Sequence, residues 1–189
     1  LIENDFVSEL GFSRGPLREA LRRLEAEGVV TLEKNRGAVV RRWSRVDIHH
    51  LYDVRELLEP QAAKLAAELV VADPERQRRL ETSRRRMRKT AEDAVSDYVR
   101  ENVRFHVLIA ELSGNSWLER IIATLQLPID RLAVFGFVTK GASENSLHDH
   151  EEIIDAILAG EGSKAEKAMR AHLRTSRKMV VSLPDRAFR

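Results

Sequence analysis

Hydrophobic residues near the start of the chain recur with the period of an amphipathic helix. Between Ser13, a favourable N-cap residue, and Gly28, a typical residue after a helix end, apolar side chains are spaced by three, four and seven positions. These side chains are Leu17, Ala20, Leu21 and Leu24. A shorter helical pattern occupies 3–10 and is separated from the longer one by Gly11. Two helices joined by a tight turn predict a helix-turn-helix.

The hydrophobic period changes after Gly28. Two short runs rich in β-branched residues, 29–32 and 38–40, flank the turn residues of 34–37. This arrangement predicts a β-hairpin. A helix-turn-helix followed by a two-stranded wing predicts a winged helix over 1–43, with a basic linker at 41–45.

The rest of the chain, 44–189, keeps the helical period almost throughout. We expect about six helices, so the fold class is mainly α, with an all-α helical bundle after the winged helix. In the first of these helices the pattern predicts one buried face, formed by Leu51, Val54, Leu57, Leu58, Ala62, Leu65, Ala66 and Leu69. The other helices are expected at 75–93, 95–112, 117–138, 144–159 and 163–182.

The composition of the 189 residues narrows the possible chemistry. There is no cysteine, which excludes disulfides, thiolate metal sites and a cysteine nucleophile, and which fits a reducing cytoplasm. Any metal site must therefore use histidine and oxygen ligands. No apolar run approaches the roughly 18 to 20 residues of a membrane-spanning helix, so no membrane partner is expected. The net charge of +2 comes entirely from residues 1–45, which contain nine basic and seven acidic residues. The N-terminal part is therefore the candidate for a polyanionic partner.

A row of arginines follows one outer face of the predicted helix 13–27. At positions i, i+4 and i+8 the chain carries Arg14, Arg18 and Arg22. On a helix in the major groove, such guanidinium groups reach guanine edges or phosphates. The same candidate DNA interface includes Ser13 at the helix start and, at the wing tip, Arg36 and Gly37. The alternative is a solvated face whose arginines pair with Glu19 and Glu25, but the position between a glycine turn and a hairpin favours DNA.

Three of the six histidines are candidate metal ligands. His106, His150 and His172 fall in three different predicted helices, and Asn102 lies one turn before His106 on the same helix face. Imidazole nitrogens with an amide oxygen suit zinc, nickel or a similar divalent ion. The alternative is a metal-free hydrogen-bonded network, and the spacing alone leaves both open.

Two further basic features also have two interpretations each. Arg55 could hold the carboxylate of an effector through two hydrogen bonds, or it could pair with Glu59 four residues later. The arginine-rich run 76–89 is interpreted as a solvated helix face, with added attraction to DNA as the alternative. Neither spacing decides between the two interpretations.

Residues 13–28, with the sequence SRGPLREALRRLEAEG, resemble the signature of GntR-type transcription regulators. The remainder is similar to the helical FCD effector domain of the FadR subfamily. Its motifs are Val54-Arg55-Glu56-Leu57-Leu58-Glu59-Pro60, Asn102-x-x-Phe105-His106, Ser113-Gly114-Asn115, His150-x-x-Ile153-Ile154-Asp155-Ala156-Ile157 and Ala168-Met169-Arg170-Ala171-His172-Leu173. The resemblance covers essentially the whole chain. It also implies that the first part of the winged domain precedes Leu1.

The resemblance implies a homodimer whose helical domain binds a small carboxylate effector on a divalent metal. The ligands of the family, an Asp and three His, fall on Asn102, His106, His150 and His172. Asn102 is a departure, because the loss of an anionic ligand should weaken metal binding and favour an anionic effector. Gly15 and Asn4 depart as well, where the family commonly has Thr and Arg in its DNA-binding domain.

We therefore expect a cytoplasmic transcription regulator with a DNA-binding domain at 1–43 and an effector-binding and dimerisation domain at 44–189. Its expected partners are double-stranded operator DNA, the effector and a second copy of the chain. One alternative keeps the regulator but makes the effector pocket metal-free, as in acyl-CoA-binding members of the subfamily. A histidine-based metallo-enzyme is a remote alternative, because there is no HExxH motif and the winged helix would have no role. We therefore expect no enzyme activity.

Overall fold

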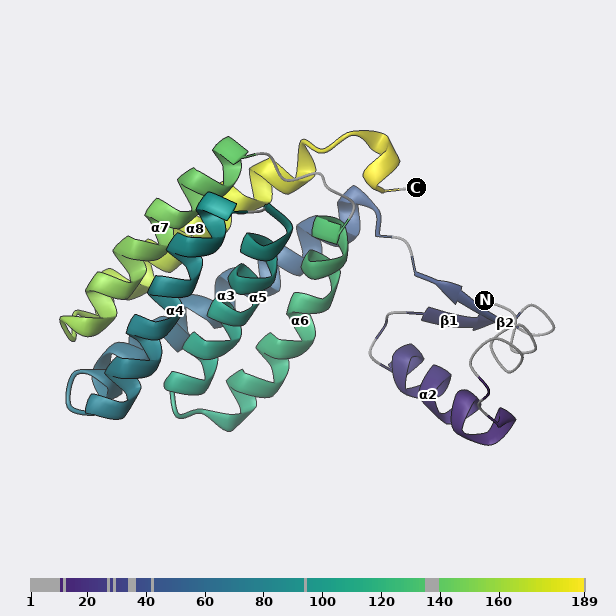
Figure 1. The fold of residues 1–189 in the computed structure, drawn as a ribbon, viewed down its shortest axis with the longest axis horizontal. Coiled ribbons are helices and arrows are strands. Elements are labelled where there is room, and N and C mark those ends of the chain that lie inside the picture. Colours follow the sequence, from purple (N-terminus) through teal and green to yellow (C-terminus); the bar gives the residue numbers. More distant parts are fainter. Residues whose placement is uncertain are drawn as a thin grey trace. The chain divides into compact units, whose positions relative to one another are not determined.

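The computed structural model of the chain describes residues 11, 13–26, 28, 30–33, 37–41, 43–93, 95–134 and 140–188. The chain forms two compact units, Leu1–Trp43 and Ser44–Arg189, and both are drawn in Figure 1. The predicted helix at 3–10 and the wing tip at 34–36, which includes Arg36, lie outside the described residues.

The described part of the first unit contains the predicted helix and hairpin (Figure 1). Helix α2 (Arg14–Ala26) is followed by the antiparallel strands β1 (Val30–Glu33) and β2 (Gly37–Val40). Between helix and strand, Gly28 has a φ of 73°, a left-handed conformation that suits glycine after a helix end.

A small apolar core holds α2 against the hairpin. Leu21, Val30 and Ala38 are buried together, and Leu17 and Leu32 pack against them. A polar contact adds to this core, because the backbone N–H of Leu32 donates to the Glu25 carboxylate at 2.8 Å. The predicted apolar face of the helix therefore packs through Leu17 and Leu21.

The described part of the second unit is a bundle of six α-helices, as predicted (Figure 1). They are α3 (Arg45–Val70), α4 (Pro74–Asp93), α5 (Val95–Leu112), α6 (Ser116–Val134), α7 (Lys140–Leu158) and α8 (Gly162–Val181). Helix α3 packs most extensively against α8 and also contacts α5, α6 and α7. A short 3-10 helix, Asp185–Ala187, follows α8. The bundle is thus built around α3.

Short polar side chains define where several helices begin. Ser44 and Asp47 form a capping box at α3, in which each side chain bonds the backbone N–H of the other. Asp73 accepts hydrogen bonds from two backbone N–H groups in the first turn of α4, at 2.9 and 3.1 Å. Asn115 does the same for α6, at 3.0 and 3.2 Å. These caps satisfy N–H groups that have no partner within the helix.

The predicted buried face of α3 is partly wrong. Val54, Leu57 and Leu69 are exposed, with relative exposures of 41%, 71% and 42%, whereas the charged residues Arg55 and Glu59 are buried at 1% each. Helical periodicity places charged residues outside by default. Here two opposite charges four residues apart neutralise each other, so they can occupy the buried face.

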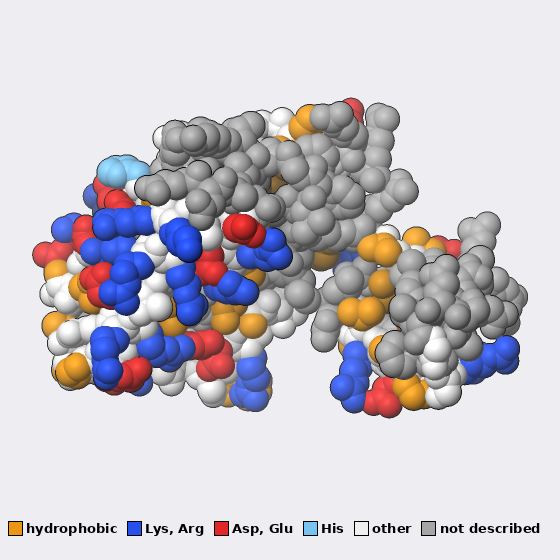
Figure 2. Space-filling model, in the orientation of Figure 1, with side chains coloured by type: hydrophobic (Ala, Val, Ile, Leu, Met, Phe, Trp, Pro, Cys, Tyr) orange, Lys and Arg blue, Asp and Glu red, His pale blue; other side chains and the backbone are white. Residues whose placement is uncertain are grey.

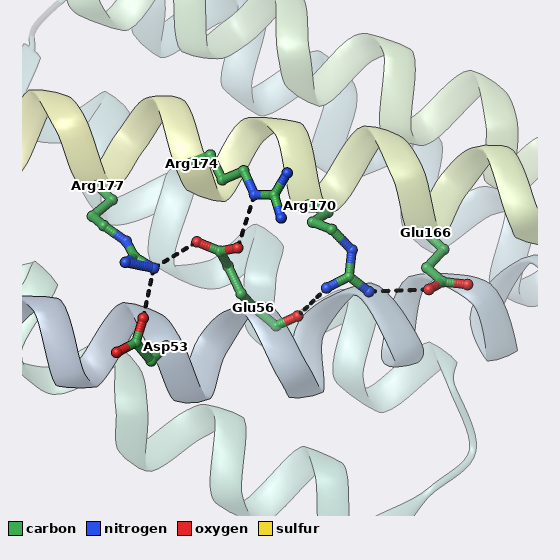
Figure 3. A network of polar contacts seen from close by, with 6 residues as sticks. All are labelled: Asp53, Glu56, Glu166, Arg170, Arg174 and Arg177. Atoms are coloured by element: carbon green, nitrogen blue, oxygen red, sulfur yellow. Dashed lines mark hydrogen bonds and ion pairs between the residues drawn. The ribbon is translucent and has the colours of Figure 1, made fainter.

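Pro60 lies inside α3 and removes one backbone donor from the helix. A residue at this position would normally donate its N–H to the carbonyl of Glu56, and proline has no N–H. That carbonyl instead accepts a hydrogen bond from Nη1 of Arg170 on α8, at 2.8 Å (Figure 3). A side chain of α8 therefore replaces the missing backbone bond of α3.

More arginines of α8 bind the same turn of α3 (Figure 3). The Glu56 carboxylate accepts from Arg174 Nε at 3.0 Å and from Arg177 Nη2 at 2.8 Å. Arg177 also contacts Asp53 at 2.7 Å. Ion pairs therefore lie beside the packed interface of α3 and α8 and hold the two helices together.

The first turn of α3 is also tied to the end of α8. Arg45 donates from Nε to the Val181 carbonyl at 3.1 Å and from Nη2 to the Leu183 carbonyl at 2.7 Å. Its Nη1 pairs with Asp185 at 2.6 Å, and its guanidinium lies 4.5 Å from the centroid of the Phe188 ring. A single side chain therefore joins the start of the bundle to its C-terminal segment.

Replacing Arg170 by methionine is expected to lower the free energy of unfolding by about 1–2 kcal/mol, because the Glu56 carbonyl loses its donor. In a Pro60→Ala background the same replacement should cost less, since alanine restores the backbone N–H. Urea unfolding of the four proteins of this double-mutant cycle measures the difference.

Arg174→Met is the matched control, because Arg174 contacts the carboxylate of Glu56 and not its carbonyl. Its cost should be the same with proline or alanine at position 60. If Arg170→Met costs equally much in both backgrounds, Arg170 does not compensate for the proline.

Candidate functional site

The structure brings three of the predicted site residues together inside the bundle. His106 on α5, His150 on α7 and His172 on α8 are buried at 2%, 0% and 2% exposure. One ring nitrogen from each lies within 4.8 Å of the others, and Nε2 of His150 is 3.1 Å from Nε2 of His172. This histidine cluster has the size and donor atoms of a metal site.

Each ring of the histidine cluster has a polar partner at its Nδ1 atom. The three distances are 2.5 Å from His106 to Glu59 Oε2, 3.2 Å from His150 to the Tyr98 hydroxyl and 3.3 Å from His172 to Asp149 Oδ2. We call Glu59, Tyr98 and Asp149 the outer partners. Since Nδ1 is engaged in every ring, Nε2 is the nitrogen that remains to each histidine for a ligand.

Burial sets the charge state of the cluster. It lowers the pKa of His106 to about 4 against the opposing influence of Glu59, and it lowers the pKa of His150 well below its ordinary value. Two of the imidazoles are therefore neutral at pH 7. The neutral imidazole is the form that binds a metal ion.

Glu59 is held by several donors at once. Arg55 Nε donates to its Oε1 at 2.5 Å, and Gln126 Nε2 donates to the same oxygen at 3.2 Å. Burial alone would raise the pKa of Glu59, but the neighbouring Arg55 and His106 outweigh it and keep that pKa well below its usual range. The carboxylate is therefore ionised, and its second oxygen is directed at His106.

Of the two interpretations of Arg55, the structure shows the pair with Glu59. Its guanidinium also lies 4.8 Å from the centroid of the Tyr52 ring. A direct contact of Arg55 with an effector stays a prediction. Arg55 belongs to the site through Glu59, which touches His106.

Asn102 lies half-buried on α5, on the helix face that also carries the first ligand candidate, His106. Tyr98 precedes it by four residues, so Tyr98, Asn102 and His106 follow each other at one-turn intervals. This spacing could have identified Tyr98 from the sequence. Glu59 was expected only as a partner of Arg55, and Asp149 was not expected at all.

The candidate DNA-binding residues of the first unit are placed as follows. Ser13 directly precedes α2, and Arg14, Arg18 and Arg22 are exposed along it. Of the two acidic residues of this helix considered above, Glu19 pairs with Arg23, and Glu25 accepts from the backbone N–H of Leu32 on β1. Gly37 begins β2 with a φ of 78°. Arg36 lies outside the described residues.

The arginine-rich helix α4 lies on a surface where basic and acidic side chains alternate (Figure 2). Two of its arginines pair across to α7, Arg84 with Asp155 and Arg88 with Glu151, each at 2.5 Å. A groove of 670 Å³ between α4 and α5 is lined by residues of both signs and by none of the histidines. This face fits the solvated interpretation of the basic run.

In the described part of the chain, no helix combines the length and apolar character that crossing a bilayer requires. The helices of the bundle are instead amphipathic or, like α4, strongly charged.

Comparison with known proteins identifies both units. Residues 1–40 match the bacterial regulatory proteins of the gntR family, and residues 50–175 match the FCD domain. The transcriptional regulator LutR of Bacillus subtilis is 30% identical over 182 residues, which cover 85% of this chain and 81% of LutR. The transcriptional repressor RspR of Escherichia coli is 25% identical, covering 92% of this chain and 75% of RspR.

Solved structures show the same fold. The Escherichia coli protein McbR/YncC aligns with a TM-score of 0.82 at 18% identity, over 95% of this chain and 85% of its own. A GntR regulator from Rhodococcus sp. RHA1 aligns with a TM-score of 0.78 at 22% identity, over 95% and 86%. The matched families and these relatives are regulators and not enzymes. The chain therefore belongs to the GntR family and is a DNA-binding transcription regulator with an FCD domain.

Proposed function

We propose that the FCD domain senses a small carboxylate effector through a divalent metal ion held by the histidine cluster. The observation that carries this proposal is the convergence of the three rings, each with a polar partner at Nδ1 and with one nitrogen within 4.8 Å of those of the other two. Three imidazole donors in a buried site suit zinc or nickel, which would act by drawing in an anionic ligand. The amide of Asn102, one turn from His106, is the proposed fourth protein ligand.

The charge of such a centre favours a carboxylate. Three imidazoles and an amide leave the two positive charges of the ion without an anionic ligand. A small organic acid would supply that ligand. With Asn102 in place of an Asp ligand, the proposed centre therefore favours an anionic effector more strongly.

A metal-free effector pocket is the second candidate. The 3.1 Å contact between His150 Nε2 and His172 Nε2 supports it, since a single proton between these atoms satisfies both rings without an ion. The two candidates differ in whether an added divalent metal is needed for effector binding.

The first unit is proposed to bind operator DNA through Ser13, Arg14, Arg18, Arg22, Arg36 and Gly37. A homodimer would present two such units to the two halves of a pseudo-palindromic site. Effector binding would change the populations of bundle conformations and thereby the spacing of the two units. Such a regulator would act in the cytoplasm. Because its effector domain is of the FCD type, we also assign it to the FadR subfamily as part of this proposal.

A thermal-shift titration tests the sensing function. Zn²⁺ or Ni²⁺ at about 100 times its Kd should stabilise the tag-free protein by about 2.7 kcal/mol, a rise in Tm of about 5–10 °C. Small carboxylates should add a further rise only when the metal is present. EDTA should remove both effects.

The outcomes separate the two candidates. No shift with any divalent metal, together with a shift by carboxylates or acyl compounds alone, would overturn the metal-dependent mechanism in favour of the metal-free pocket. Elemental analysis of the same protein should find about one divalent ion per chain if the mechanism is correct.

A further inference from the structure

The charges around the histidine cluster are arranged one layer outward from the rings. None of the four proposed ligands, Asn102 and the three histidines, is a carboxylate. Among the residues that the structure describes, two of the outer partners, Glu59 on α3 and Asp149 on α7, bring a carboxylate into contact with the rings. Both carboxylates contact Nδ1 of a histidine.

The contact of Glu59 with His106 is fixed by its surroundings. Arg55 and Gln126 both bind Oε1, which leaves Oε2 for the imidazole. Among the described residues, neither Glu59 Oε2 nor His106 Nδ1 has any other hydrogen-bonding partner. An ionised carboxylate at this place accepts the Nδ1–H and presents Nε2 as a lone pair.

Asp149 has the same relation to His172, but from a more open position. Its Oδ2 lies 3.3 Å from His172 Nδ1, and its side chain is 30% exposed. The third ring, His150, has the neutral hydroxyl of Tyr98 instead. Two of the three rings are therefore polarised by a carboxylate, which raises the basicity of the opposite nitrogen.

We infer that Glu59 and Asp149 are positioning residues of the metal centre and supply, through His106 and His172, the negative charge that the Asn102 amide lacks. The inference rests on the proposed function, since it concerns the same metal. It places the two carboxylates behind the rings, at the Nδ1 atoms of His106 and His172. Neither is one of the four proposed metal ligands. The two protein carboxylates then strengthen metal binding without taking a ligand position that the carboxylate of the effector needs.

Metal affinity of two isosteric variants tests the inference. Glu59→Gln and Asp149→Asn should each raise the Kd for Zn²⁺ or Co²⁺ by about 10- to 100-fold in competition with a chelating dye. The visible spectrum of the Co²⁺ form should change in both, because the rings are no longer fixed. Asp149→Asn keeps the test valid if Glu59→Gln, which leaves Arg55 buried without its partner, fails to fold.

Two matched variants control for loss of charge on the same helices. Glu56→Gln removes a carboxylate one turn earlier on α3, and Asp155→Asn removes one from α7 that pairs with Arg84. Both should keep the wild-type Kd, even if the Tm of the metal-free protein falls.

An added ligand charge provides the reverse test. Asn102→Asp should lower the Kd and should restore the affinity that Asp149→Asn loses. If the wild-type protein binds no metal, the proposed function fails. If it binds metal and both Glu59→Gln and Asp149→Asn bind equally well, the proposed function stands and the inference is overturned.

Discussion

Replacing His172 by alanine is expected to raise the Kd for Zn²⁺ or Ni²⁺ by more than about 100-fold, beyond the 10- to 100-fold effect of an outer partner. The replacement removes one of three nitrogen donors and leaves Nε2 of His150 without its neighbour at 3.1 Å. Chelator competition gives the affinity, and elemental analysis after dialysis gives the bound metal. Circular dichroism of the metal-free protein checks that the bundle still folds.

His148→Ala is the matched control for this variant. His148 lies two residues before His150 on α7, but its side chain is 74% exposed and faces Glu152. Its replacement should leave both the metal content and the Kd unchanged. Equal metal content in His172→Ala and in the wild-type protein would show that the ion, if any, binds elsewhere.

Replacing Arg18 by alanine is expected to weaken specific operator binding strongly, so that little complex forms at concentrations that half-saturate the wild-type protein. A bidentate contact of arginine with guanine is worth about 1–3 kcal/mol, which corresponds to a loss of affinity of roughly 5- to 150-fold. The operator can be obtained by selection from random DNA, and fluorescence anisotropy at fixed salt measures the affinity. Affinity for unrelated DNA should fall much less.

Arg23→Ala is the control on the same helix. Arg23 is exposed like Arg18, its Nη2 pairs with Glu19 at 2.5 Å, and it is not one of the proposed DNA-binding residues. Its loss should leave operator specificity intact. Metal affinity should stay at the wild-type value in both variants, because the first unit contains no member of the histidine cluster. An Arg18→Ala protein that still selects the operator would remove Arg18 from the interface.

The order of the elements could be predicted from the sequence because it depends on local signals. Asp73 before Pro74, Asn115 after Gly114 and Gly160 after α7 mark helix ends through caps and a left-handed glycine. The change of period after Gly28 marks the hairpin in the same way. These signals act within a few residues and do not require knowledge of the packing.

The inward face of α3 could not be predicted because it depends on partners far along the chain. A charged residue is assigned to the surface unless its partner is known, and Glu59 has partners on α5 and α6 as well as on its own helix. The same holds for Asp149, which adjoins a cluster residue in sequence but binds His172, 23 residues later. The helix positions of the three histidines make them candidates but leave a metal-free network open, and the family resemblance is needed to name them as ligands of one metal.

The contacts of Arg45 connect the first residues of the second unit to its last helix. The chain enters this unit at Ser44 and leaves α8 at Val181, and one guanidinium group joins the two places. Arg45 therefore links the start of α3 to the end of α8, the helix against which α3 packs most extensively. Helix α8 also carries His172. An axial displacement of this helix would shift the carbonyl groups that bind Arg45. A shift of α8 would therefore reach the first residues of the second unit through this one side chain.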